Sequence, residues 1–270
     1  DQINNLLNSM GDDGKAVYQI DGYNVVVHRI PGYSNKVLIN NISNKINVTK
    51  DWGNTPDSYK KPVTVQLYKE VVNRDGDLEL EPVGEPIVLT EETNWAGWFG
   101  GVKRIDEDGE PIKYHVAEVK IGDFEKDSAV TVEDIANGYV IGPNGLYKVR
   151  IENDGTDDVI VKNEIERTDI WAIKLWAEGA PKVPVEFTLF AKKGDAYTKA
   201  TDSAIVAVDA NPPEIVFTGV PKLDENGNEI SYYVFETKIG ETVANHNYSN
   251  NYTVKVPGGT YTVDIPMNGV

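Results

Sequence analysis

The 270-residue sequence contains no cysteine, so no disulfide can hold the fold and no thiolate can act as a nucleophile or metal ligand. It has no apolar run near the roughly 20 residues of a membrane-spanning helix, so we expect no direct membrane contact. Basic residues are also few, because 26 Lys and Arg stand against 43 Asp and Glu and give a net charge of −17. This balance argues against nucleic acid and anionic membrane surfaces as partners.

The sequence shows no signal of cofactor binding or catalysis. It has no phosphate-binding loop, no metal-ligand cluster and no nucleophile–base–acid set, so we predict no cofactor and no enzymatic turnover. The acidic stretches 106–110 and 224–229 begin like a calcium loop but lack its twelfth-position glutamate, which favours polar turns. No signal peptide or sorting signal is visible, and since the chain begins within a pattern we expect it to be a piece of a longer polypeptide.

The sequence does contain many short runs in which Val, Ile, Thr and Tyr alternate with polar residues, separated by Gly, Pro, Asn and Asp. This pattern predicts an all-β sandwich or barrel. One short helix is predicted at 131–139. The clearest predicted strands are 63–68, 112–119, 146–152, 185–191 and 252–256.

The chain also repeats itself. Residues 99–122 match residues 217–240 without a gap, and 13 of the 24 positions are identical. Extending the match in both directions predicts two complete domains, 45–166 and 167–270, and residues 1–44 as the C-terminal part of a preceding copy. Similar domains with almost no linker predict a rod.

A lysine falls between apolar residues near the start of each complete copy. In a strand, Lys50 shares a face with Val48 and Trp52, and Lys174 shares a face with Ala172 and Trp176. The simplest interpretation is an edge lysine whose stem packs while its head reaches water. The repetition of the pattern points instead to a buried amine with a function.

The motifs VTKDW (48–52), NWAGWFGGV (94–102) and IVKN (160–163) resemble the B-type repeat domain of the staphylococcal collagen adhesin. The resemblance covers about residues 45–270. That domain is widespread in surface adhesins and pilins of Gram-positive bacteria, and its fold is a β-sandwich of inverse immunoglobulin-like topology. Many members join a lysine of the first strand to an asparagine of the last by an isopeptide bond, which a glutamate on a central strand promotes.

Carried over residue by residue, the resemblance implies Lys50, Glu118 and Asn163 in the first complete copy. In the second copy it implies Lys174, Glu236 and Asn268, because Asn163 follows Tyr147 by 16 residues and Asn268 follows Tyr252 by the same interval. Two bonds, and thus the loss of two ammonia molecules, are predicted.

In the predicted partial copy before residue 45, the glutamate of the set cannot be assigned. Val27 occupies the glutamate position, and Asn41 is the candidate asparagine without an assigned acid.

Elementary chemistry explains why such a set would react. Burial pushes a lysine toward its neutral, nucleophilic amine and a carboxyl group toward its protonated form, which can polarise an amide carbonyl. For Glu118 and Glu236 the simpler alternative is a solvated strand residue. However, Tyr114 and Val116 share the face of Glu118, which favours an inward carboxyl group.

The predicted function is therefore a structural stalk or spacer of an extracellular adhesin or pilus-type protein, anchored to the cell wall through a region outside this sequence. Its partners are the neighbouring domains of the same surface protein.

The alternative is a ligand-binding module for a host matrix protein or glycan, in which exposed tryptophans would form a binding face. Strand alternation predicts that most of the five tryptophans are core residues, with Trp95 and Trp98 the least certain.

Overall fold

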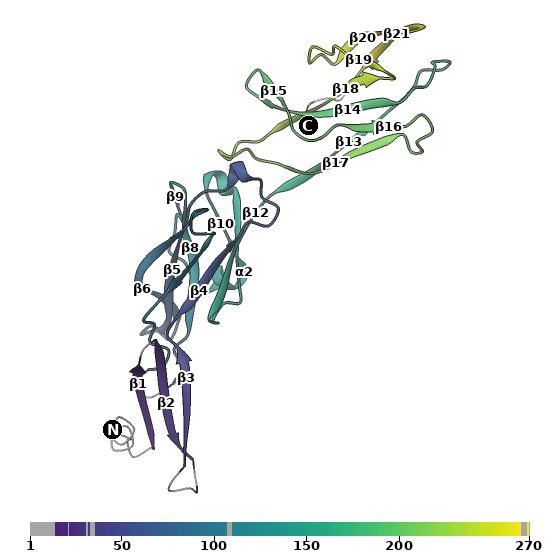
Figure 1. Cartoon of the computed structure of the whole chain (residues 1–270). Coiled ribbons are helices and arrows are strands. Elements are labelled where there is room, and N and C mark those ends of the chain that lie inside the picture. Colours follow the sequence, from purple (N-terminus) through teal and green to yellow (C-terminus); the bar gives the residue numbers. More distant parts are fainter. Residues whose placement is uncertain are drawn as a thin grey trace. The chain divides into compact units, whose positions relative to one another are not determined.

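The structure, a computed structural model, describes residues 14–20, 22–30, 32, 36–106, 110–265 and 269. The chain divides into two compact units, Asp1–Glu164 and Ile165–Val270. Both consist almost entirely of β-strands (Figure 1), which confirms the predicted all-β class. All five clearest predicted strands are present, and the predicted helix is α2 (Val132–Asn137), capped by Thr131 and Asp134.

The first unit begins with a three-stranded antiparallel sheet in the order β1-β2-β3. Its strands are β1 (Lys15–Ile20), β2 (Tyr23–Arg29) and β3 (Val37–Ser43). The buried Asn24 side chain donates to the Val102 carbonyl (3.0 Å), which ties this sheet to the rest of the unit. The assignment of residues 1–44 to a separate preceding domain stays a prediction.

The remainder of the first unit is a sandwich of two sheets. One sheet has the order β10-β11-β12-β4-β7, and the other has the order β6-β5-β8-β9. The strands of the first sheet are β4 (Ile46–Asp51), β7 (Ala96–Phe99), β10 (Tyr139–Ile141), β11 (Tyr147–Glu152) and β12 (Asp158–Ile165). Those of the second are β5 (Val63–Val72), β6 (Leu78–Leu89), β8 (Tyr114–Ile121) and β9 (Phe124–Glu125). Single 3-10 turns lie at Asp57–Tyr59 and Pro143–Gly145.

Strand alternation builds the core between these sheets. Val63, Val65 and Leu67 of β5 are almost fully buried, and β8 places Val116 and Glu118 in the same layer. The hairpin from β8 to β9 turns at Gly122, whose φ of +55° suits glycine.

The second unit contains the same kinds of strand but a divided sheet. One sheet has the order β15-β14-β18-β19, with β16 also paired to β14, and two separate pairs are β13–β17 and β20–β21. The strands of the sheet are β14 (Val185–Lys193), β15 (Ala196–Lys199), β16 (Ala204–Val206), β18 (Ser231–Ile239) and β19 (Thr242–Val243). The separate pairs are β13 (Arg167–Ile173) with β17 (Glu214–Pro221), and β20 (Asn251–Val256) with β21 (Gly259–Asp264).

The tryptophans only partly follow the prediction that most are core. Trp52 is buried, and Trp95 packs edge-on against it with ring centroids 5.2 Å apart. Trp98 and Trp171 are each 60% exposed, so core placement is wrong for Trp171. The reason is alternation itself, because Trp171 points away from the core-facing Ile170. Across the described residues, no helix is long and apolar enough to cross a membrane.

Candidate functional site

The candidate site of the first unit lies under the seam between its first and last strands. β12 pairs in parallel with β4, and Val161 stands opposite Lys50. Asn163 is two residues further along β12 and therefore faces the same way as Val161. The first and last strands of the sandwich thus meet at the predicted site, although they are more than 100 residues apart in the sequence.

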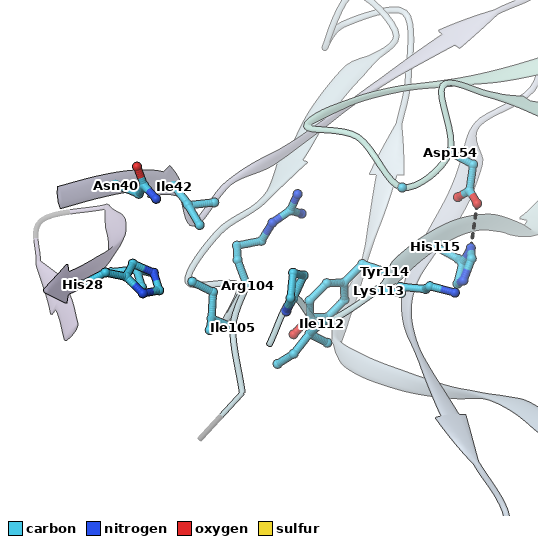
Figure 2. A pocket seen from close by; sticks show the side chains of 13 residues that line it. His28, Asn40, Ile42, Arg104, Ile105, Ile112, Lys113, Tyr114, His115 and Asp154 are labelled. Carbon is cyan, nitrogen blue, oxygen red and sulfur yellow. Dashed lines mark hydrogen bonds and ion pairs between the residues drawn. The ribbon is translucent and has the colours of Figure 1, made fainter. Parts of the chain in front are cut away.

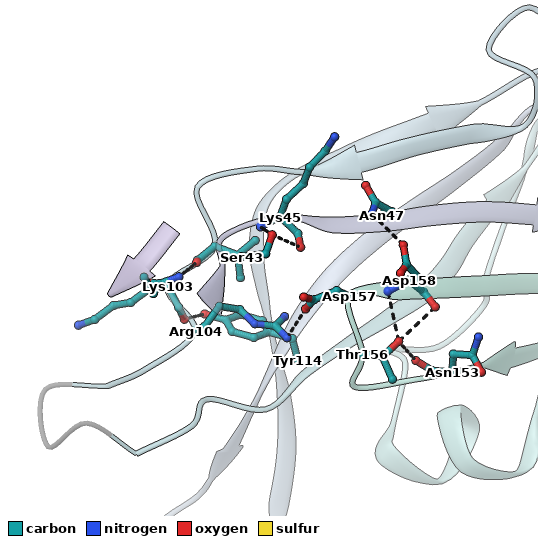
Figure 3. Close-up of polar contacts among 12 residues, drawn as sticks. Ser43, Lys45, Asn47, Lys103, Arg104, Tyr114, Asn153, Thr156, Asp157 and Asp158 are labelled. Carbon is teal, nitrogen blue, oxygen red and sulfur yellow. Dashed lines mark hydrogen bonds and ion pairs between the residues drawn. The ribbon is translucent and has the colours of Figure 1, made fainter. Parts of the chain in front are cut away.

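Polar contacts at the start of the seam hold this register (Figure 3). The Asn47 side chain donates to Asp158 Oδ1 (2.8 Å), linking β4 directly to β12. Arg104 binds Asp157 (2.7 Å), and the Thr156 hydroxyl accepts from the backbone N–H of Asp158 (3.2 Å). A slip of one residue would turn every inward side chain of β12 outward, so these contacts keep Asn163 inside.

Lys50 is buried between the two sheets, and its side chain is fully excluded from solvent. Its ammonium donates to the carbonyls of Asp51 (3.1 Å) and Val161 (3.2 Å), and it lies 4.3 Å from the Trp52 ring centroid. The edge-lysine interpretation is therefore wrong for Lys50, since neither its stem nor its head reaches water.

Glu118 and Asn163 complete the buried set. The Asn163 carboxamide donates to Glu118 Oε1 (2.9 Å), and Glu118 Oε2 lies 3.9 Å from Lys50 Nζ. Both residues are 0% exposed, which rules out the solvated interpretation of Glu118. Within the described structure, Glu118 Oε2 and Asn163 Oδ1 have no hydrogen-bond partner. Two unsatisfied buried oxygens are costly, and so mark this cluster as more than packing.

Burial shifts both titratable groups of the set toward their uncharged forms. Burial lowers the pKa of Lys50 to about 8 and raises the pKa of Glu118 to about 7, although their mutual attraction opposes both shifts. An amine and a carboxylic acid are therefore accessible near neutral pH. Beside a carboxamide, they form a nucleophile, an acid and an acyl group in one dry site.

The second unit brings together only two of the three predicted residues. Lys174 Nζ binds Glu236 Oε1 (2.7 Å), and Lys174 lies over the Trp176 ring at 4.5 Å, as Lys50 lies over Trp52. The side chains of Lys174 and Glu236 are 12% and 5% exposed. Asn268 lies outside the described residues.

Strand pairing shows that the alignment used to select Asn268 is wrong. Tyr139 pairs with Val149 in the first unit, and Tyr252 pairs with Val263 in the second. The Tyr139 hydroxyl donates to the Glu118 carbonyl (2.7 Å), and the Tyr252 hydroxyl donates to the Glu236 carbonyl (3.0 Å). Tyr252 therefore corresponds to Tyr139 rather than to Tyr147.

A second pair of tyrosines confirms this correspondence. Tyr147 packs edge-on against Trp52 with centroids 6.1 Å apart, and Tyr261 packs in the same way against Trp176 at 5.8 Å. Hence β20–β21 is the counterpart of β10–β11, and none of the described strands is the counterpart of β12. The 16-residue interval from Tyr252 therefore does not support Asn268, whose role as the partner of Lys174 stays a prediction.

The sequence interpretation paired Tyr252 with Tyr147 and missed that Tyr261 is the counterpart of Tyr147. The signal was present, because GLYKVRI (145–151) and GTYTVDI (259–265) share the spacing of Gly, Tyr, Val and Ile. In residues 1–44, predicted to be part of a preceding copy, Val27 is buried on β2 and Asn41 is exposed on β3. No acid is assigned to Asn41.

A pocket of about 610 Å³ lies elsewhere in the first unit, lined by residues of β2, β3 and β8 (Figure 2). At its edge His115 Nδ1 lies 2.6 Å from Asp154 Oδ2, and His115 Nε2 lies 3.3 Å from Glu70 Oε2. The Asp154 hydrogen bond, partly opposed by burial, raises the pKa of His115. The histidine thus fastens the turn between β11 and β12 to the central strands. In the described part of the chain, no group of three or more His, Asp or Glu side chains could hold a metal ion.

The two sandwich units with a lysine and a glutamate at matched core positions define a tandem module of the immunoglobulin-like all-β class. The sequence matches the Cna protein B-type domain over residues 46–142 and 170–262. The chain belongs to this family. No curated protein sequence matches it.

Solved structures are also similar to the chain. Two B repeat units of the collagen-binding protein of Staphylococcus aureus share 21% identity, with 94% of this chain and 58% of that chain covered and a TM-score of 0.38. The chain therefore spans little more than half of that structure. The pilus adhesin SpaC of Lactobacillus rhamnosus GG shares 13% identity, with 91% and 30% covered and a TM-score of 0.28. The major pilin T3.2 of Streptococcus pyogenes shares 15%, with 83% and 92% covered and a TM-score of 0.27.

Proposed function

We propose that the chain is a structural spacer of a Gram-positive cell-surface adhesin or pilus-type protein, and that an isopeptide bond between Lys50 and Asn163 locks its first unit. The observation that carries the proposal is the complete burial of Lys50, Glu118 and Asn163 together beneath the β4–β12 seam. Burying three polar side chains together without solvent raises the free energy of the folded state, and the proposed reaction lowers it by converting the amine and the carboxamide into an uncharged amide.

The reaction balances with these three residues alone. Glu118, in its protonated form, donates a hydrogen bond to Asn163 Oδ1 once the carboxamide turns by half a rotation from the orientation in which Nδ2 donates. The neutral Lys50 amine attacks Cγ, and a bond from Nζ to Cγ forms. Glu118 takes one proton from Nζ and passes a proton to Nδ2, the bond from Cγ to Nδ2 breaks, and ammonia leaves. Folding supplies proximity and orientation, so no cofactor takes part. Each chain reacts once and does not turn over.

The bond has a mechanical consequence that fits a spacer. Tension carried through neighbouring domains enters the unit near β4 and leaves near β12. A covalent link between these strands carries the load past the hydrogen-bonded sheets. The same link limits local opening, which exposes a chain to proteases.

The location and partners follow from the family and stay part of the proposal. Members of this family occur in surface adhesins and pilins, which implies an extracellular chain held at the cell surface, with neighbouring domains as its partners. The alternative of a glycan-binding tryptophan face has less support, because Trp95 packs on Trp52 and Lys45 covers the exposed Trp98 at 4.3 Å.

Intact-mass spectrometry of the purified chain tests the bond. We expect the mass to be lower than the sequence mass by one ammonia, and a digest to contain one branched peptide joining Lys50 to Asn163. Glu118→Gln should restore the missing mass because the acid is lost. The matched control Glu164→Gln alters a partly exposed neighbour on β12 and should leave the deficit unchanged. A wild-type mass equal to the sequence mass would refute the proposal, whereas a deficit of two would indicate that Lys174 also reacts within this chain.

A further inference from the structure

The strand that carries the candidate glutamate of the first unit contains a β-bulge directly after that residue. In the pairing of β8 with β5, Glu118 and Lys120 stand opposite adjacent residues of β5. Val119, which lies between them, is therefore the extra residue of the bulge. Bulges often lie beside functional sites, where they change the direction of a side chain.

The bulge decides which side chains of β8 face the core. Strict alternation from Glu118 would point Lys120 inward and Ile121 outward. With the extra residue in place, Ile121 is only 1% exposed, and the Lys120 amine lies outside the core, where it pairs with Glu125 (3.6 Å). The bulge thus keeps a second amine out of the site that holds Lys50.

A bulge also disrupts the strand ladder, so the backbone beside Glu118 depends on other partners. The carbonyl of Val119 accepts from the backbone N–H of Lys126 (3.0 Å), directly after β9. The carbonyl of Glu118 accepts from the Tyr139 hydroxyl (2.7 Å). Because β10 belongs to the other sheet of the sandwich, the Tyr139 side chain ties the bulge to the facing layer.

The surroundings of Tyr139 keep it in place as a hydrogen-bond donor. The Lys126 ammonium lies 5.4 Å from the centroid of its ring and pairs with Asp134 of α2 (3.1 Å). Burial, together with the nearby Glu118 carboxyl group, raises the pKa of Tyr139 well above its ordinary value. The phenol therefore keeps its proton throughout the pH range in which Lys50 becomes a neutral amine, and it adds no charge to the site.

The second unit repeats this arrangement. Glu236 and Lys238 of β18 stand opposite adjacent residues of β14, so Thr237 is the extra residue of a bulge. The Thr237 carbonyl accepts from the N–H of Ala244 (2.9 Å), directly after β19. The Tyr252 hydroxyl donates to the Glu236 carbonyl (3.0 Å) and accepts from the Glu236 N–H (3.1 Å). The bulge residue itself differs between the units, whereas the bulge and the tyrosine hydroxyl are present in both.

We propose that Tyr139 is a positioning residue of the crosslinking reaction, because its hydroxyl fixes the backbone of Glu118 at the bulge and so directs the carboxyl group toward Asn163. This role rests on the function proposed above, since it requires that reaction. Glu118 Oε1 accepts from the Asn163 carboxamide (2.9 Å), and Glu118 Oε2 lies 3.9 Å from Lys50 Nζ. A misplacement of about 1 Å can slow a reaction about 100-fold, so a loosened Glu118 backbone should slow bond formation.

Tyr139→Phe tests this role, and Tyr114→Phe is the matched control. Each substitution removes a hydroxyl that donates to a backbone carbonyl at 2.7 Å, but the Tyr114 hydroxyl binds Lys103 rather than the glutamate. Full-length chains made by cell-free translation are quenched at intervals, and intact mass gives the fraction that has lost ammonia. We expect bond formation to be slower by about tenfold or more in Tyr139→Phe and to stay within about twofold of wild type in Tyr114→Phe.

Two further measurements separate positioning from stability. In the Lys50→Met background, where no bond can form, Tyr139→Phe and Tyr114→Phe should lower the melting temperature by similar amounts, because each loses one hydrogen bond. All rates are measured at a temperature at which circular dichroism shows every variant folded. A variant in which para-aminophenylalanine replaces Tyr139 keeps an N–H donor at the same reach, and it should restore the rate to within about threefold of wild type.

The outcomes distinguish this role from the crosslink itself. If the wild type loses ammonia and Tyr139→Phe reacts as fast as Tyr114→Phe, Tyr139 positions nothing, and the inference is overturned while the proposed function stands. Rates that follow the melting temperatures of the variants, or a para-aminophenylalanine variant that stays slow, would overturn it as well. If the wild type loses no ammonia, the proposed function fails and this role fails with it.

Discussion

Replacing Lys50 by Met tests how much the proposed bond stabilises the first unit. Methionine keeps most of the volume of the lysine stem but has no amine, so the crosslink cannot form. The bond closes a loop of 113 residues (163 − 50). By analogy with a disulfide across about 100 residues, losing this closure costs about 4–5 kcal/mol through the entropy of the unfolded chain. Methionine adds no buried charge, and Asn163 and Glu118 can still hydrogen-bond to each other, so the polar groups that remain add less to the cost than the lost closure does.

Calorimetry converts this estimate into a measurable shift. For a unit of 164 residues, 1 kcal/mol corresponds to about 2–4 °C, so the melting temperature of the first unit should fall by about 8–20 °C. Lys162→Met is the matched control, since Lys162 lies in the same sheet, is partly exposed and pairs only at 3.6–4.0 Å with its acidic neighbours. Its substitution should cost no more than about 1 kcal/mol.

The prediction fails in a definite way. If the wild-type mass shows the bond and yet Lys50→Met melts within about 1 kcal/mol of wild type, closing the loop does not stabilise the unit and the entropy argument is wrong. If both variants lose the same large amount, the effect comes from the sheet rather than from the bond. The transition of the second unit supplies an internal reference in every scan.

Three further outcomes are expected. When unreacted chain is refolded from denaturant, the rate of bond formation should be highest between about pH 7 and 8. Below that range Lys50 loses its neutral amine form, and above it Glu118 loses its protonated form. A rate that rises steadily with pH would contradict the role of Glu118. Because the pKa of His115 is raised, its ion pairs stabilise the fold below the unfolded pKa of about 6.5, and this stabilisation is lost as pH rises through the folded pKa. In denaturant titrations, His115→Gln should therefore lower the free energy of unfolding by about 1–2 kcal/mol near pH 5.5 and by much less near pH 9. Equal losses at both pH values would refute this pH dependence. In single-molecule pulling, unfolding of the Lys50→Met first unit should release about 400 Å more contour length than unfolding of the wild-type unit, from 113 residues at about 3.5 Å each. Equal contour lengths would show that no bond between Lys50 and Asn163 carries the force.

The sequence predicted the burial of Lys50 and Glu118 because each of them has a local signal. Alternation placed Lys50 inward beside Val48 and Trp52, and it placed Glu118 inward beside Val116. The structure has all of these buried. The pairing of β4 with β12 is not local, and it came from the family resemblance rather than from periodicity. Likewise, no sequence pattern indicated that Asn47 and Asp158 pin the register of the seam.

The second site was harder because two hairpins of similar sequence compete for one alignment. NYTV (251–254) resembles LYKV (146–149) at Tyr and Val, so the copies could be aligned one hairpin out of step. Cross-strand pairing resolves this, since Val254 opposes Tyr261 as Ile141 opposes Tyr147. Identity over a few residues of a strand cannot distinguish neighbouring strands that share one binary pattern.

In the proposed reaction, β12 has two roles, because it supplies the reacting carboxamide and it excludes water from the site. In the first unit β12 delivers Asn163 and covers the amine with Val161, and the Lys50 side chain is wholly excluded from water. In the second unit, where no described strand takes that place, the equivalent lysine keeps 12% of its side chain exposed in an open groove. In the proposed reaction, the desolvation that makes Lys50 nucleophilic is therefore complete only once β12 has brought Asn163 beside it.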